Sequence, residues 1–119
     1  MQLKINSARP VYLQIEEHIR NAVITNYYPP GSRIPAVREL AAELKVNPNT
    51  VQRAMAELEQ QGLLIANGTL GKIVTNDQAV IDSTKNLAIQ SVIKECVRQF
   101  KSLGISAKEA AQLLQLEEE

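Results

Sequence analysis

Two amides and a guanidinium share one face of a short predicted helix in the middle of the chain. At about 100° per residue, Asn49, Gln52 and Arg53 lie on one side of this helix, and a set of apolar residues lies on the other. In the major groove of DNA, Asn and Gln match the edge of adenine, and Arg matches the edge of guanine. These residues could therefore read bases. An ordinary solvated face of an amphipathic helix is the alternative interpretation of the same pattern.

The beginning of this helix is clearly marked in the sequence. Asn47 is a good N-cap, and Pro48 suits the first helical position because its φ is already helical and its missing N–H is not needed there. Glu57 would repel phosphates, so we expect only the first two turns to enter a groove. The apolar stripe that faces the core consists of Val51, Ala54, Met55 and Leu58.

Three further segments place this helix in a larger pattern. Residues 10 to about 27 predict a first helix that ends at Pro29-Pro30-Gly31, and residues 37–45 predict a second one. Only Asn47-Pro48 separates the second helix from the third, which is the spacing of a helix-turn-helix. Asn67-Gly68 lies between β-prone residues and predicts a β-hairpin. This hairpin is either a wing that contacts DNA or a plain hairpin that only completes the core.

A long helical pattern follows the hairpin. From Asp77 to Leu103 it predicts a helix of roughly 40 Å, which is too long for so small a domain to cover. Ser106 and Glu109 form a capping box that opens a last helix. We expect the apolar stripe of this helical hairpin to be buried against a second copy of the chain, with packing on its own domain as the alternative. The residues expected at the dimer interface are Leu87, Val92, Ile93, Cys96, Val97, Phe100, Leu103, Leu113 and Leu114.

The fold class that follows is mainly α with a small β-hairpin. We expect a winged helix-turn-helix domain over residues 1–75 and a helical dimerisation tail over residues 76–119. The 119-residue chain has no tryptophan and one phenylalanine, so its core must be mostly aliphatic. Its formal net charge is zero, so any affinity for DNA must come from the local arrangement of charges.

Several other classes of function are not indicated. One cysteine and one histidine provide no disulfide, no cysteine-rich zinc site and no catalytic set, so we expect no enzyme, no metal and no cofactor. No apolar run approaches the roughly 18 residues of a membrane-spanning helix, and the amino terminus does not resemble a signal peptide. We therefore expect a cytoplasmic protein with no membrane partner.

The order of elements resembles the winged helix-turn-helix domain of the GntR family of bacterial transcription regulators. The motifs that carry this resemblance lie at residues 10–15, 30–35, 37–41 and 46–51. The string Val-Asn-Pro-Asn-Thr-Val at residues 46–51, together with the short two-helix tail, is similar to the YtrA subfamily in particular.

This resemblance implies a dimeric repressor whose recognition helices bind the two halves of a palindromic operator in double-stranded DNA. Subfamily members often control transporter operons, so we expect such an operon here. The residues that match DNA contacts of the family are Arg38, Asn47, Asn49, Thr50, Gln52 and Arg53. Gly71 and Lys72 are the DNA contacts expected in the wing. Arg33 and Lys45 are added as phosphate neighbours on charge alone, with solvated surface as the alternative.

Two departures from the family pattern bear on these contacts. Ala36 stands where many relatives have a serine before the second helix, so one cap or phosphate contact is missing. Residues 69–71 lack the basic residue that the family wing usually has between two glycines. We therefore expect the wing to contribute less to DNA recognition than the helix at residues 48–58.

Two questions stay open at this point. An unidentified small-molecule effector would have to bind between the tail helices or near the dimer interface, where no polar cluster marks a site. A winged-helix module that binds protein rather than DNA is the competing function. Zero net charge favours this module, whereas the Asn, Gln and Arg face of residues 49–53 opposes it.

Overall fold

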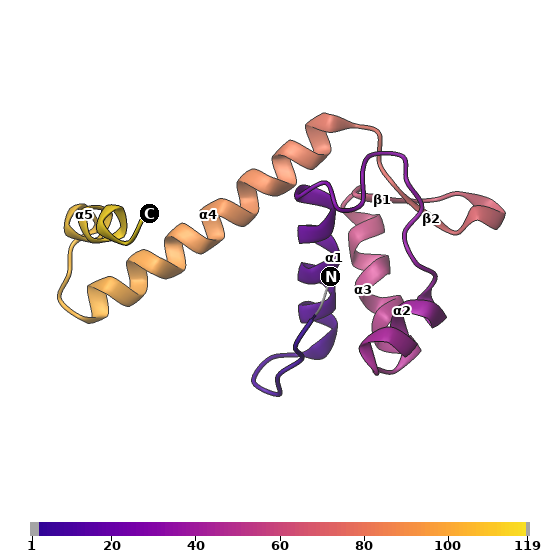
Figure 1. Ribbon diagram of the computed structural model, residues 1–119, viewed down its shortest axis with the longest axis horizontal. Coiled ribbons are helices and arrows are strands. Elements are labelled where there is room, and N and C mark those ends of the chain that lie inside the picture. Colours follow the sequence, from indigo (N-terminus) through magenta and orange to yellow (C-terminus); the bar gives the residue numbers. More distant parts are fainter. Residues whose placement is uncertain (1–2, 119) are drawn as a thin grey trace. The chain divides into compact units, whose positions relative to one another are not determined.

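The computed structural model describes residues 3–118, apart from the side chain of Leu70. Within this range the chain is mainly helical with one β-hairpin, as predicted (Figure 1). The elements are α1 (Val11–Ile24), α2 (Val37–Leu44), α3 (Pro48–Gln60), β1 (Leu64–Ala66), the 3₁₀ turn η1 (Gly68–Leu70), β2 (Lys72–Val74), α4 (Gln78–Ser102) and α5 (Ala107–Glu117). The chain forms two compact units, Met1–Thr84 and Lys85–Glu119, which are described separately below.

The first helix is shorter than expected. It ends at Ile24 rather than near Tyr27, because Asn26 has a φ of 65°, in the left-handed region that interrupts a helix. Near its start, the buried side chain of Gln14 accepts a hydrogen bond from the N–H of Asn6 and donates to the carbonyl oxygens of Asn6 and Arg9. These bonds hold the segment that precedes α1 against the helix, and they satisfy a polar group that would otherwise be costly to bury.

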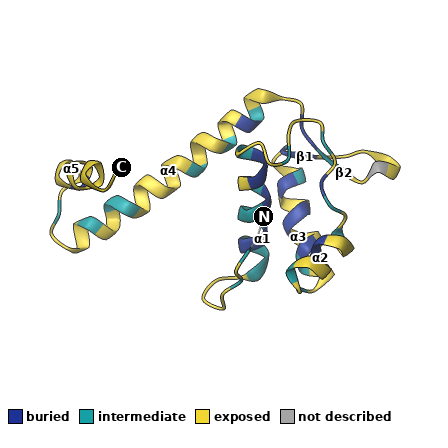
Figure 2. Ribbon diagram, in the orientation of Figure 1, coloured by how far each residue is buried: buried dark blue, intermediate teal, exposed yellow. Residues whose placement is uncertain are grey.

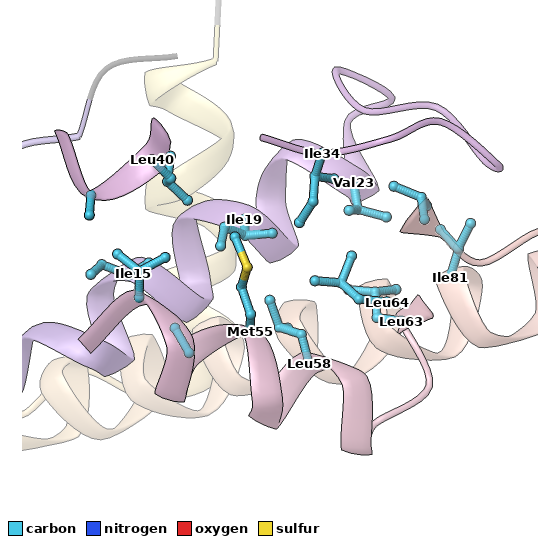
Figure 3. Close-up of a cluster of buried hydrophobic side chains, with 14 residues drawn as sticks. Ile15, Ile19, Val23, Ile34, Leu40, Met55, Leu58, Leu63, Leu64 and Ile81 are labelled. Atoms are coloured by element: carbon cyan, nitrogen blue, oxygen red, sulfur yellow. The ribbon is translucent and has the colours of Figure 1, made fainter. Parts of the chain in front are cut away.

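The core of the first unit is aliphatic, as the composition predicts. Figure 2 shows buried positions along α1 and α3. Ile15 and Ile19 of α1 meet Met55 and Leu58 of α3, and all four side chains are almost fully buried (Figure 3). Burial of one such side chain contributes about 1.5–3 kcal/mol, so this contact fixes α3 firmly on α1. The other members of the cluster are Val23, Ile34, Leu40, Ala41, Val51, Ala54, Leu63, Leu64, Val74 and Ile81.

The predicted hairpin is present, but Asn67-Gly68 does not form a tight two-residue turn. The strands pair antiparallel with Leu64 opposite Val74 and Ala66 opposite Lys72, so residues 67–71 form the connection. Asn67 has a φ of −129°, whereas a type I′ turn needs a positive φ at both central residues. The 3₁₀ turn η1 takes up the extra length.

Strand β2 is hydrogen-bonded on its second side by the segment that connects α1 and α2. The N–H of Gly31 donates to the carbonyl oxygen of Val74 at 2.9 Å, and the N–H of Val74 donates to Ser32 at 2.8 Å. The N–H of Ile34 donates to the carbonyl oxygen of Lys72 at 3.1 Å. Residues 31–34 therefore fix the base of the hairpin to the helices, which positions Lys72.

The turn between α2 and α3 contains a strained residue. Lys45 has φ 58° and ψ 48°, a left-handed conformation that costs a residue with a Cβ about 1–2 kcal/mol and costs glycine little. The N–H of Val46 donates to the carbonyl oxygen of Ala41, and this bond closes the end of α2 over the turn. The strain is thus held in place by the packing of α2 on α3.

Replacing Lys45 with glycine is expected to raise the free energy of unfolding by about 0.5–1 kcal/mol, because the left-handed backbone is then unstrained. Urea unfolding followed by circular dichroism measures this gain. Lys45→Ala is the matched control, since it removes the same charge and keeps the Cβ. Equal stabilisation by both variants would mean that charge, not backbone strain, is responsible.

The second unit begins within α4 and contains α5. Gly104, with φ 81°, follows α4, and the Oγ of Ser106 accepts from the N–H of Glu109 at 3.1 Å, so the predicted capping box is present. Ala110 is buried, whereas most of α4 in this unit is exposed (Figure 2). The first turns of α4 belong to the first unit, because Val80 and Ile81 pack on its core. The domain boundary predicted after Thr75 stays a prediction.

Candidate nucleic-acid interface

Helix α3 is divided into a buried and an exposed face, as predicted. Val51, Ala54, Met55 and Leu58 are buried completely, and Asn49, Gln52 and Arg53 are exposed. Thr50 lies at the boundary and is partly buried. The two amides and the guanidinium are therefore available to a partner.

The start of α3 is rigid because its cap is satisfied. The Oδ1 of Asn47 accepts from the N–H of Asn49 at 2.8 Å, which confirms the predicted N-cap. Pro48 occupies the first helical position. The cap uses the carbonyl oxygen of the Asn47 side chain and leaves its amide nitrogen free to donate to a phosphate or a base. Asn49 thus lies in the capped first turn of α3.

Helix α2 begins with only half of a capping box. Ala36 has no side-chain acceptor, so the one bond formed is that from its N–H to the Oε1 of Glu39, at 3.3 Å. Arg38, one residue before Glu39, is exposed and has no hydrogen bond or ion pair among residues 3–118. Its guanidinium is therefore free to bind an anion beside α3.

Two other predicted cationic contacts, Arg33 and Lys72, lie close to carboxylates of the chain. The Nη2 of Arg33 lies 3.6 Å from the Oε1 of Glu39, and the Nζ of Lys72 forms an ion pair with Glu59. Arg33 is well exposed, so its pair is weak, whereas the Lys72 ion pair is partly buried and joins β2 to the last turn of α3. Gly71 is exposed and has a φ of 80°, which only glycine adopts readily.

Sequence reasoning missed two residues of this surface. Glu59 holds the wing lysine, and Tyr12 of α1 lies under Arg53, whose Cζ is 3.7 Å from the centre of the tyrosine ring. Neither contact has a local signal, because the partners are 13 and 41 residues apart in the chain. Periodicity within one helix reports which face is buried, but not which residue of another helix meets it.

A Glu59→Gln substitution is expected to increase affinity for DNA about 2- to 5-fold at low salt, because it releases Lys72 from its carboxylate. The slope of log affinity against log salt should steepen by about 0.9, which corresponds to one more phosphate contact. Fluorescence anisotropy at several salt concentrations measures both. Glu117→Gln in α5 makes the same change in net charge. An equal gain in that control would show that overall charge, and not the Lys72 ion pair, sets the affinity.

The apolar residues of α4 and α5 are largely exposed in the single chain. Val92 is 70% exposed, Ile93 54% and Leu103 76%, while Cys96, Val97 and Phe100 are partly buried. At 100° per residue the five of these side chains that belong to α4 fall within one arc of the helix, and Leu103 follows directly after its last residue. Leu113 and Leu114 of α5 are also exposed. An exposed apolar surface of this kind is typical of an interaction site.

Leu87 lies apart from the other residues predicted for the dimer interface. It lines a shallow hollow of about 410 Å³ with Gln90, Ser91, Lys94, Glu95 and Arg98, on the polar side of α4. Arg98 and Gln99 donate to the carboxylate of Glu95, and these bonds lower its pKa to about 2. This side of α4 is therefore polar and internally paired.

Among residues 3–118, no group of three or more His, Cys, Asp or Glu side chains could hold a metal ion. In the same range, none of the helices combines the length and the apolar character that crossing a membrane requires.

The chain is similar to known bacterial regulators. A family model described as bacterial regulatory proteins, gntR family, matches residues 11–74, which include all of the helix-turn-helix and the hairpin. An uncharacterized HTH-type transcriptional regulator of Bacillus subtilis, YhcF, is 33% identical over 92% of this chain and 90% of its own length. The HTH-type transcriptional repressor YtrA of the same organism is 29% identical over 90% of this chain and 78% of its own length, in line with the predicted YtrA resemblance.

The similarity extends to a solved structure. A GntR family transcriptional regulator from Listeria monocytogenes superimposes with a TM-score of 0.89 at 31% sequence identity, and the match covers 96% of this chain and 100% of that chain. Both the helix-turn-helix and the two tail helices lie within this match, since it leaves out almost none of the chain.

Proposed function

Because the chain belongs to the GntR family of bacterial regulatory proteins, whose members are DNA-binding transcription regulators and not enzymes, we propose that it is a homodimeric repressor. Each copy inserts α3 into the major groove at one half of a palindromic operator in double-stranded DNA. The name of the relative YtrA, a transcriptional repressor, supports repression rather than activation.

The exposed face of α3 is the observation that carries this proposal. Asn49 and Gln52 have amide groups that suit adenine, and Arg53 has a guanidinium that suits guanine. Asn49 lies in the capped first turn of α3. The buried face of the same helix packs into the core, which fixes the helix in place. Arg38 supplies an unpaired positive charge on the neighbouring helix, where it can bind a phosphate and set the register of the complex.

The exposed apolar arc of α4, together with Leu113 and Leu114 of α5, supports the proposed dimerisation. An isologous interface between two copies would cover this arc with the same surface of the partner. Two-fold symmetry of the dimer then matches two-fold symmetry of the operator. The regulated genes are proposed to form a transporter operon on the YtrA resemblance alone, and the protein acts in the cytoplasm, where that DNA lies.

To test this proposal, the full chain is first used to select the sequences that it binds from a random pool of DNA duplexes. Anisotropy then compares the selected duplex with a scrambled one of the same composition. A preference of at least about 1,000-fold is expected of a specific regulator. Affinity should fall with salt with a log–log slope of about −0.9 for each phosphate contacted. Equal affinity for both duplexes would contradict a specific operator.

The competing interaction module predicts a different result in solution. Amide chemical shifts around residues 49–53 would stay unchanged when DNA is added, and a protein partner would shift them instead. Membership of a family of DNA-binding regulators favours the DNA outcome. An unidentified small-molecule effector stays part of the proposal, with the space between the tail helices or near the dimer interface as its expected place.

A further inference from the structure

Arg53 is held in a different way from the other cations near α3. Its Cζ lies 3.7 Å from the centre of the Tyr12 ring, so the guanidinium is stacked on the aromatic face. Tyr12 is the second residue of α1 and is partly buried, whereas Arg53 is exposed. The contact therefore joins two helices that the core packs together, and it lies at the solvent-facing edge of that packing.

The stack leaves the hydrogen-bonding capacity of Arg53 intact. A guanidinium that stacks on a ring uses its face, and its five N–H donors point outward in the plane of the group. Lys72 is instead hydrogen-bonded to the carboxylate of Glu59, and Arg33 lies 3.6 Å from the carboxylate of Glu39. Among residues 3–118, Arg53 has no carboxylate partner. The Tyr12 ring thus orients the guanidinium of Arg53 without neutralising its positive charge.

We propose that Tyr12 is a positioning residue for DNA recognition, because its ring holds the guanidinium of Arg53 with its donor edge ready for guanine. This inference rests on the proposed function and adds a residue outside the helix-turn-helix to it. A long, flexible arginine normally loses side-chain freedom when it binds, and a side chain that is already ordered loses less. The stack therefore increases both the affinity and the base preference that Arg53 provides.

A double-mutant cycle on the full chain tests this inference. The DNA is a duplex selected from a random pool by the unaltered chain, with a set of single-base variants of it. Tyr12→Leu is expected to weaken binding to the selected duplex about 2- to 5-fold and to reduce discrimination at one base pair. Tyr12→Phe keeps the ring and should retain the affinity. In the Arg53→Ala background, Tyr12→Leu should have no further effect.

Three results would overturn the inference. One is an equal loss from Tyr12→Leu with and without Arg53, and another is a loss that is the same for every single-base variant. The third is a Tyr12→Phe variant as weak as Tyr12→Leu. Circular dichroism melting of each variant keeps a loss of fold separate from these outcomes. If the proposed function itself is wrong, the unaltered chain will bind selected and scrambled duplexes with equal affinity. That result differs from the three above, and it would also contradict the inference about Tyr12.

Discussion

An Ile93→Asp substitution is expected to convert the protein into a monomer and to lower its affinity for a full palindromic duplex about 100-fold or more. Ile93 is 54% exposed in the single chain and lies within the apolar arc of α4. Two-fold symmetry would bury this carboxylate twice, once from each copy, and both charges would lose water without gaining a partner. Loss of the second half-site contact removes the avidity of a two-site complex. Sedimentation velocity and anisotropy measure the two effects.

The polar side of the same helix provides the matched control. Ser91→Asp introduces the same charge on α4 at an exposed position that lines the polar hollow, so the dimer should persist. A duplex with a single half-site should bind Ile93→Asp as well as it binds the unaltered chain, because α3 is untouched. Persistence of the dimer in Ile93→Asp would show that the apolar arc has another partner.

The second large effect is expected at Arg38. Replacing it with alanine should weaken binding to the selected duplex roughly 10- to 100-fold, which corresponds to the 1.5–3 kcal/mol of a hydrogen bond to a charged group. The reason is that its guanidinium is exposed and unpaired within the described chain, so it loses no internal partner when it binds a phosphate. Anisotropy at fixed salt measures the loss, and thermal melting should be unchanged.

Arg98→Ala controls for net charge, because it removes a guanidinium from α4 that is already paired with Glu95. Its effect on affinity should be small. A comparable loss in both variants would mean that the overall field of the protein, rather than a contact of α2, attracts the DNA. Loss of affinity for the selected duplex alone, with scrambled DNA unaffected, would assign Arg38 to base reading instead of phosphate binding.

Features encoded by neighbouring residues could be predicted from the sequence. The cap at Asn47, the buried stripe of α3 and the capping box at Ser106 each depend on residues within one or two turns. The end of α1 was the exception, because Asn26 adopts a left-handed conformation that its residue type permits but does not require.

Features that depend on distant residues could not be predicted. The Lys72 ion pair with Glu59 and the stack of Tyr12 on Arg53 depend on how helices and strands pack, and the position of Lys72 in the wing gave no sign of its carboxylate partner. Leu87 was included with the interface residues as part of the helical pattern of residues 77–103, and it lies among polar side chains of α4, so its place in an interface stays a prediction. The structure thus separates the candidate residues into two groups. The side chains of Arg38, Gln52 and Asn49 have no ion pair or hydrogen bond among the described residues, whereas Arg33 and Lys72 have carboxylate partners.

The hydrogen bonds of β2 to residues 31–34 have a consequence for the order of folding. These bonds join segments about 40 residues apart, whereas the contacts of α2 with α3 close within a short loop. During synthesis, Gly31 emerges from the ribosome long before Val74, so the base of the wing cannot form until nearly the whole first unit has been made. A nascent chain that ends within α3 can form its helices, but it lacks the hydrogen bonds that complete the DNA-binding unit.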